Sequence, residues 1–430
     1  MAPAENPKPC EDATLATVAD LVRSYLPVRD LVRYQLVSKE WQTWCIGNAT
    51  PFRKVQKDWY FPTGIRFRTQ KPTWFGLHHD SEMEHRLPDF EFLSARKIKF
   101  LTAAGGLLLL RTQSWEEDTP SPVPKLVVCN PLTRKWRDVP ILDRKLPKLE
   151  YMCSCVLYTQ GLCDVVIHMV VDAASGTYEI LMMQSPVYIF AFSSRTNEWR
   201  SISPHRNLEN SMKFNSKNGI IGSLYSNGRI YALEIVESQR GQHVAARVYL
   251  VASRRWLPDI YPLHDEMRCC DTFVKGRAAY APSLVAILGD VYAVLPGLES
   301  QARGRRRCSS RCIQPPHFRY HRQATVTSFE IFKLEEGEKK FSFCATLPLQ
   351  VTFSMKFEIH NNFCVDLYSW YTCAANGTVI WVACEDRLIQ FDVVTGSCKM
   401  QVQPEGAYRF YDDNEGNPMP LYEPSFHIRP

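Results

Sequence analysis

The residues best suited to chemistry lie close together near residue 310. They are Cys308, Cys312, His317 and His321. Two thiolates and two imidazoles can complete the tetrahedral shell of a structural zinc ion. Only four residues separate Cys312 from His317, however, which is too short for the hairpin and helix of a zinc finger, and the neighbouring arginines would repel a cation. We therefore expect no metal at this position.

A second group of potential metal ligands consists of His78, His79, Asp80 and His85. It falls between two stretches whose residues favour strands. We interpret the group as an exposed turn and not as a metal site.

The chain carries none of the common catalytic motifs. It has no Gly-rich phosphate loop ending in Lys-Ser or Lys-Thr, no His-Glu-x-x-His and no Gly-x-Ser-x-Gly. The close thiol pairs, Cys153 with Cys155 and Cys269 with Cys270, lack the two-residue gap of a redox motif. We therefore expect a protein that is not an enzyme and that needs no cofactor.

Bulk properties indicate a protein of a reducing compartment. The fifteen cysteines are odd in number and scattered, as expected for small buried apolar residues and not for a disulfide framework. No stretch reaches the ~18 to 20 apolar residues of a membrane span, and residues 1–10 are proline-rich without the apolar core of a signal peptide. We expect no contact with membranes and a location in the nucleus, the cytoplasm or both.

The positive charge of the chain comes from one segment at about 299–324. Seven arginines lie there with no acidic residue between them, so the rest of the chain has 44 basic residues (51 minus 7) against 45 acidic ones. The segment can be a solvated loop, a nuclear-import patch or a contact for an acidic partner or nucleic acid, and nucleic acid is the least expected of these. The residues that would form the basic patch are Arg303, Arg305, Arg306, Arg307 and Arg311, with Arg319 and Arg322 further along.

Residues 14–56 predict a small head of three helices, preceded by a disordered start at 1–13. The first helix shows apolar residues at steps of three and four from Leu15 to Leu26 and ends at Pro27. Asp30 can cap a second helix, and Ser38 can begin a third that carries Trp41. So small a unit leaves much apolar surface in water, so it needs a partner.

The head resembles the F-box, the motif that docks substrate receptors onto the Skp adaptor of cullin-based ubiquitin ligases. The resemblance is carried by Leu-Pro-Val-Arg-Asp-Leu-Val-Arg at 26–33 and Val-Ser-Lys-Glu-Trp at 37–41. It implies that the adaptor, and through it the cullin and RING subunits, is a partner, and that Trp41 belongs to the motif's own core. The alternative is a plain three-helix cap on the β domain. The adaptor-facing residues implied are Val18, Val22, Leu26, Pro27, Leu31 and Val37.

From residue 57 to 430 the chain predicts an all-β domain with an internal repeat. Five segments combine an extended stretch, a turn and a second extended stretch, and their markers are Trp136, Trp199, Trp256, Phe343 and Cys398, at steps of 63, 57, 87 and 55 residues. A second marker, a tight hairpin turn at Asn227-Gly228, Gly289-Asp290 and Asn376-Gly377, repeats at 61 and 88. Both series lengthen over the same stretch, so an insertion lies there.

A repeat of about sixty residues with four strands each is typical of a β-propeller. We expect the tryptophans on the outer strands, filling the space between neighbouring blades, and Ala103 to Gly106 on an inner strand beside Leu107 to Leu110. The stretch from Cys129 to Trp136, with the strand before it, resembles the repeat of plant F-box/kelch proteins. We expect six blades, within a range of five to seven, the last one closed by strands from 59–68 and 408–427.

Three classes of function follow. The first, which we favour, is the substrate-recognition subunit of a Skp–cullin–F-box ubiquitin ligase, whose propeller holds a target protein near the ubiquitin-loaded enzyme. The second is an interaction scaffold whose degenerate F-box does not serve a ligase. The third is a carbohydrate-binding or enzymatic propeller, and a shared fold alone does not decide between them.

Overall fold

The structure, a computed structural model, is all-β apart from one short 3-10 turn in the part of the chain that it describes. It describes residues 60–68, 71–78, 84–86, 90–93, 97–114, 123–140, 166–172, 174–185, 188–202, 220–238, 241–263, 282–299, 320–359, 371–384 and 387–402. The helical head predicted for 14–56 lies outside these ranges. The same is true of residues 1–13 and of the predicted strand at 408–427.

Five sheets of four strands, which we call blades 1 to 5, follow one another along the chain. The innermost strands are β4 (Lys97–Ala104), β8 (Val166–Asp172), β12 (Ile220–Ser226), β16 (Ser283–Ile287) and β20 (Tyr371–Asn376). The second strands are β5 (Leu107–Ser114), β9 (Thr177–Ser185), β13 (Arg229–Ser238), β17 (Asp290–Glu299) and β21 (Val379–Cys384). The third strands are β6 (Val123–Asn130), β10 (Tyr188–Ser193), β14 (Gly241–Leu250), β18 (Tyr320–Glu335) and β22 (Arg387–Asp392). The outermost strands are β7 (Lys135–Val139), β11 (Glu198–Ile202), β15 (Arg255–Pro262), β19 (Lys340–Ile359) and β23 (Cys398–Val402).

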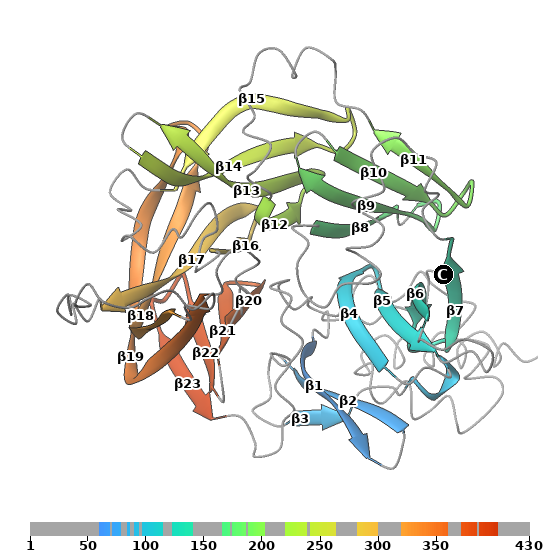
Figure 1. The fold of residues 1–430 in the computed structure, drawn as a ribbon, viewed down its shortest axis with the longest axis horizontal. Coiled ribbons are helices and arrows are strands. Elements are labelled where there is room, and N and C mark those ends of the chain that lie inside the picture. The colour runs from blue at the N-terminus through green and yellow to red at the C-terminus, as the bar shows by residue number, and fades with distance from the viewer. Residues whose placement is uncertain are drawn as a thin grey trace, which may run out of the picture.

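The blades are arranged around a common centre as a β-propeller (Figure 1). The innermost strands contact one another in chain order: β4 contacts β8, β8 contacts β12, β12 contacts β16 and β16 contacts β20. A sheet of three strands, β1 (Tyr60–Arg68), β2 (Lys71–His78) and β3 (Glu84–Arg86), lies between blades 1 and 5 in Figure 1. The predicted propeller is thus confirmed, and the described part has five complete blades, within the predicted range but one fewer than the expected six.

Each blade buries both of its faces, which explains the continuous apolar runs in the second strands. Leu107 and Leu109 pack towards blade 2, while Leu108 and Leu110, on the opposite face, pack with Phe90 beside η2 (Glu91–Leu93). All four leucines are fully buried, because alternate residues of a strand point to opposite faces and both faces here are covered. Similar apolar layers fill the spaces between blades 2 and 3, 3 and 4, and 4 and 5.

One turn geometry repeats between the third and fourth strand of every blade. Counted from the last residue of the third strand, its fifth residue has a positive φ in each case, and the fourth strand begins one or two residues later. These residues are Arg134 (52°), Asn197 (59°), Arg254 (53°), Lys339 (54°) and Gly396 (68°). The residue two positions later is Trp136, Trp199, Trp256, Phe341 and Cys398 in turn.

This register confirms the outer-strand position of the three tryptophans and corrects the fourth marker. Phe341, which is buried, holds the equivalent position in blade 4, whereas Phe343 is 57% exposed. Phe343 lies on the same face of β19 as Phe341, two positions further on, so the alternation of faces alone does not separate the two. With Phe341 the steps become 85 and 57.

The inner hairpins are also close to the prediction, with small shifts of register. Asn227-Gly228 forms the turn as predicted, but the second turn is Leu288-Gly289 and the third Gly377-Thr378, each displaced by one residue. In blade 1 the turn is Gly105-Gly106, so these glycines connect β4 to β5 and only Ala103 and Ala104 belong to the inner strand. Positive φ values of 55° and 82° explain why glycine suits both positions.

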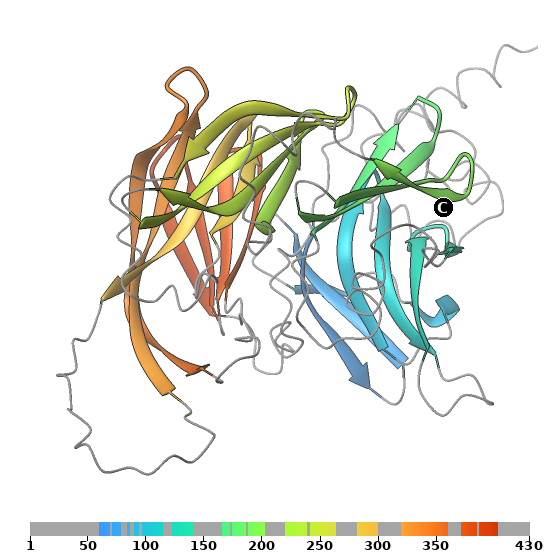
Figure 2. The same ribbon diagram turned by 45° about the horizontal axis from the view of Figure 1, so that its top comes forward.

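The predicted insertion lies between β17 and β18 of blade 4. Residues 300–319 are outside the described part, but the strands around the insertion are unusually long, with 16 residues in β18 and 20 in β19. They pair from Tyr320 opposite Ile359 down to the turn at Glu335 and Lys340, and Figure 2 shows this hairpin projecting beyond the other blades. The long hairpin was not predicted.

Candidate functional site

Several polar and charged side chains lie at the contact between blades 2 and 3, which we call the 2–3 seam. Its centre is apolar and contains Met183, Ile202, Ile230 and Trp256. Polar and charged groups flank this centre on both sides. One set lies at the outer hairpins and the other lies towards the innermost strands.

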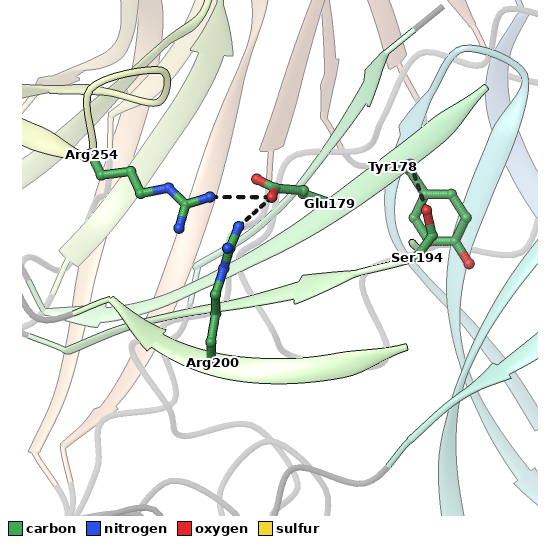
Figure 3. A network of polar contacts seen from close by, with 5 residues as sticks. All are labelled: Tyr178, Glu179, Ser194, Arg200 and Arg254. Atoms are coloured by element: carbon green, nitrogen blue, oxygen red, sulfur yellow. Dashed lines mark hydrogen bonds and ion pairs between the residues drawn. The ribbon is translucent and has the colours of Figure 1, made fainter. Parts of the chain in front are cut away.

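The outer set joins three charged side chains from three elements. Glu179 of β9 receives Arg200 of β11 and Arg254 of the β14–β15 turn, both on the same oxygen, Oε1, at 2.6 and 3.4 Å (Figure 3). Glu179 and Arg200 belong to blade 2 and Arg254 belongs to blade 3. The arrangement therefore links the two blades and leaves one positive charge in excess among the three side chains.

Tyr249 of β14 belongs to the apolar layer of the same seam. Its ring packs on Trp256 with the ring centroids 5.2 Å apart, and the residue is 1% exposed. Burial raises the pKa of its phenol to about 12, with further electrostatic effects from Arg254, Glu179 and Arg200. The hydroxyl oxygen is buried without a hydrogen-bond partner.

Tyr178, drawn beside this group in Figure 3, belongs to the contact between blades 1 and 2. Its main-chain N–H donates to Oγ of Ser194 at 2.8 Å, which ties β9 to the β10–β11 turn. Burial raises the pKa of its phenol. Arg137 of blade 1 donates to the main-chain oxygen of Ser194 at 3.3 Å, so this turn also holds blades 1 and 2 together.

The inner set contains a buried ion pair between Glu234 of β13 and Arg247 of β14. Both residues are buried and lie on the face of blade 3 that meets blade 2. Burial raises the pKa of Glu234 to about 7, against the opposing effect of the Arg247 guanidinium. A raised carboxyl pKa can serve acid–base chemistry, but this group is enclosed between two blades and bonded to an arginine.

His168 and Ser223 lie beside this ion pair on the innermost strands β8 and β12. His168 Nε2 and Ser223 Oγ are 2.7 Å apart, which hydrogen-bonds blade 2 to blade 3. Burial lowers the pKa of His168 to about 4, so the imidazole is neutral near pH 7. A histidine beside a serine is the start of a nucleophilic site, but Ser223 is buried here, and we assign the pair to the packing of the seam.

At the contact between blades 3 and 4, the charged side chains form pairs of opposite charge. Arg229 contacts Glu336 at 2.7 Å, and Lys339 contacts Asp259 at 2.7 Å, so each cation has its own carboxylate. The hydroxyl of Tyr231 donates to Glu336 at 3.2 Å. The unequal charges and the unpartnered tyrosine hydroxyl thus distinguish the 2–3 seam from this contact.

Most of the site residues predicted from the sequence lie outside the described ranges, although Arg322 falls in β18. Those outside include the adaptor-facing set, Trp41, and the arginines from Arg303 to Arg311. Of the candidate metal ligands, the backbones of His78, His85 and His321 lie in β2, β3 and β18, so His78 and His85 flank the predicted turn as strand residues. Within the described ranges no group of three or more His, Cys, Asp or Glu could hold a metal ion. Where the chain is described, no helix has the length and apolar character to cross a membrane.

Sequence reasoning missed the polar groups of the 2–3 seam, although a signal for two of them was present. Glu234 follows Tyr-Ala-Leu, and Arg247 stands between Ala-Ala and Val-Tyr-Leu, so each charge interrupts an apolar strand. Opposite charges on adjacent buried strands predict an ion pair, because an isolated buried charge is too costly. Glu179, Arg200 and Arg254 gave no such signal, since they lie in mixed polar stretches.

Comparison with known proteins gives neighbours in structure only. No protein-family model and no curated protein matches the sequence. The GH93 α-L-arabinofuranosidase of Fusarium graminearum is 9% identical with a TM-score of 0.35, covering 71% of this chain and 82% of that one. The GH74 xyloglucanase of Xanthomonas campestris is 12% identical with a TM-score of 0.34, covering 80% and 45%. A chain of the mitotic checkpoint complex is 6% identical with a TM-score of 0.28, covering 72% and 68%. Similarities of this size do not transfer an activity to this chain.

Proposed function

We propose that the chain is the substrate-recognition subunit of a Skp–cullin–F-box ubiquitin ligase. The observation that supports the proposal is the order of two parts along the chain. An F-box-like motif at 26–41 comes first, and a β-propeller follows it from β1 onward. A docking head joined to a rigid ring of sheets is the division of parts that such a receptor needs.

In this role the head binds the Skp adaptor and the propeller binds a target protein. The apolar groups of the head, Val18, Val22, Leu26, Pro27, Leu31 and Val37, contact the adaptor, while Trp41 holds the motif together. Each apolar side chain fully removed from water contributes about 1.5–3 kcal/mol before the costs of ordering, so a few of them suffice for docking. The cullin and RING subunits then bring ubiquitin-loaded enzyme to the lysines of the target.

The propeller supports this role because its blades are joined by side-chain contacts as well as by apolar layers. Trp199 bonds blade 2 to blade 1, Glu179 and His168 bond blade 2 to blade 3, and Glu336 bonds blade 4 to blade 3. A ring linked in this way can present a binding surface of fixed shape to a target. Proteins that do chemistry need groups open to a substrate, whereas Glu234 and Ser223 are closed inside the seam.

The proposal is tested by co-purification of the full chain with the Skp adaptor. We expect the double variant Leu26→Ala, Leu31→Ala to lose the adaptor, because two apolar contacts of the interface are removed. The matched control is Leu288→Ala, Val394→Ala, which removes two apolar side chains that are exposed on the propeller. It should retain the adaptor.

Retention of the adaptor by the Leu26→Ala, Leu31→Ala variant, with both proteins folded by circular dichroism, would contradict this interface. Failure of the unmodified chain to bind the adaptor would favour the scaffold in its place. A glycan array probed with the chain would detect the carbohydrate-binding alternative.

A further inference from the structure

The three charged residues at the outer edge of the 2–3 seam are not balanced in charge. Arg200 and Arg254 share a single oxygen of Glu179, and only one nitrogen of each guanidinium makes that contact. A guanidinium has five N–H donors and pairs best with two acceptor oxygens. Both arginines therefore keep donors for a second anion, and their side chains are 46% and 36% exposed.

Tyr249 provides a second, independent observation at the same place. Tyr249 is the last residue but one in the third strand of blade 3. The equivalent residues in the other blades are Cys129, Phe192, Leu334 and Phe391. None of these four residues has a hydroxyl, so packing at this position does not require one. In blade 3 the hydroxyl is nevertheless present, buried and without a hydrogen-bond partner, on the face that meets blade 2. The turn that follows Tyr249 carries Arg254, and the charges of Arg254, Glu179 and Arg200 act on its phenol.

A buried hydroxyl without a hydrogen-bond partner is destabilising, because it has lost its bonds to water. The cost is removed if an acceptor oxygen comes within reach, and an anion held between the two arginines would bring such oxygens to this edge of the seam. The neighbouring contact between blades 3 and 4 needs no ligand by the same criteria. There Tyr231 already bonds to Glu336, and Arg229 and Lys339 each have a carboxylate.

We propose that Arg200, Arg254 and Tyr249 form a binding site for an anionic side chain of a partner protein, a carboxylate or a phosphate. The ligand replaces part of the contact between Arg254 and Glu179, which at 3.4 Å is the longer of the two. A peptide segment suits the place better than an isolated ion, because the arginines lie at an exposed edge of the ring. The inference rests on the proposed function only in that the partner would then be the target of the receptor.

The test is fluorescence anisotropy of the full chain with short labelled peptides that are identical except at one central position. One peptide has phosphoserine there, one has glutamate and one has serine. We expect the two anionic peptides to bind and the serine peptide not to bind. Whichever anionic peptide binds more tightly identifies the source of the anion. Added salt should weaken binding, because exposed charges are screened.

The decisive variant is Arg200→Gln, Arg254→Gln. We expect it to weaken binding about tenfold or more, because the charged hydrogen bonds to the anion are lost. The matched control is Arg195→Gln, Arg255→Gln, which removes the same charge from neighbouring exposed positions. Arg255 adjoins Trp256 on β15 and so lies on the face opposite the seam. This control should bind as the unmodified chain does. An equal loss in both variants would reduce the site to general electrostatic attraction and would overturn the proposal.

Two further variants test the site without removing either arginine. Glu179→Gln removes the internal competitor and should tighten binding severalfold, and Tyr249→Phe should weaken it with no loss of thermal stability. Weaker binding by Glu179→Gln, or tighter binding of a short single-stranded RNA than of either anionic peptide, would contradict a protein ligand. Adaptor co-purification is measured separately. A chain that fails to bind anionic peptides can still bind the adaptor through its head, and a chain that fails to bind the adaptor can still bind the peptides.

Discussion

The indole Nε1 of Trp199 donates a 2.7 Å hydrogen bond to the main-chain oxygen of Pro140. The bond joins the outermost strand of blade 2 to the residue that directly follows the outermost strand of blade 1. Trp256 packs in the equivalent way into the apolar layer between blades 2 and 3. Trp136 differs, since it is 48% exposed.

The substitution Trp199→Phe should therefore lower the free energy of unfolding by about 1–2 kcal/mol, the sum of one hydrogen bond and some buried ring area. Trp136→Phe, at the equivalent position of blade 1, should change it by less than about 0.5 kcal/mol. Urea unfolding of the two variants measures the difference. Equal losses would show that Trp199 does not join the blades.

Because Glu234 and Arg247 form a buried ion pair, the effect of substituting one of them on stability should depend strongly on whether the other is present. Arg247→Met should cost about 3–5 kcal/mol of stability, because Glu234 is left as a buried charge without its partner. The loss should be smaller at pH 6 than at pH 8, because the raised pKa of Glu234, about 7 even with the arginine present, lets the carboxyl become neutral.

The double variant Glu234→Leu, Arg247→Met should recover most of this stability, since two apolar groups of similar size can replace a buried ion pair. A double-mutant cycle by urea unfolding measures the coupling between the two residues. Additive losses from the two single variants would contradict a direct interaction.

His168 predicts a loss of stability in acid. Its pKa is lowered by burial to about 4, while in the unfolded chain it is near 6.5, so between these values the unfolded state binds more protons than the folded state. The contribution is complete above about pH 6.5 and falls as the pH drops towards 4, by about 2–3 kcal/mol at pH 4.5. Glu234 acts in the opposite sense, because its raised pKa lets the folded state bind the extra proton.

Unfolding of the unmodified chain and of His168→Gln, measured at pH 7.5 and 4.5, isolates this contribution. The variant should be less stable at pH 7.5, where it loses the hydrogen bond to Ser223, but should lose less stability on acidification. An identical acid sensitivity in the two proteins would mean that His168 does not titrate as described.

Much of the ring was predictable from the sequence because the repeat carries its own physical markers. The turn that ends in a positive φ recurs with an aromatic residue two positions later, so Trp136, Trp199 and Trp256 fixed the outer strands of three blades. Blade 4 was misread at Phe343 because Phe341 and Phe343 share one face of a strand, and periodicity alone cannot choose between residues two apart.

The sites were less predictable than the ring. Arg200 and Arg254 are 54 residues apart in the sequence and reach the same carboxylate only because blades 2 and 3 are neighbours. No local pattern encodes such a meeting. The head was predicted in the opposite way, from a local motif with a known partner class, and its residues lie outside the described part of the chain.

Proximity labelling bears most directly on the proposed receptor role, when the full chain is compared with a chain that lacks residues 1–56. We expect both proteins to label the same propeller-bound targets, and only the full chain to label the Skp adaptor and the cullin. At least one shared target should become more abundant when the head is missing, because it is still bound but no longer ubiquitinated. If the adaptor is labelled equally by both chains, or if no shared target changes in abundance, the chain does not act as a substrate receptor.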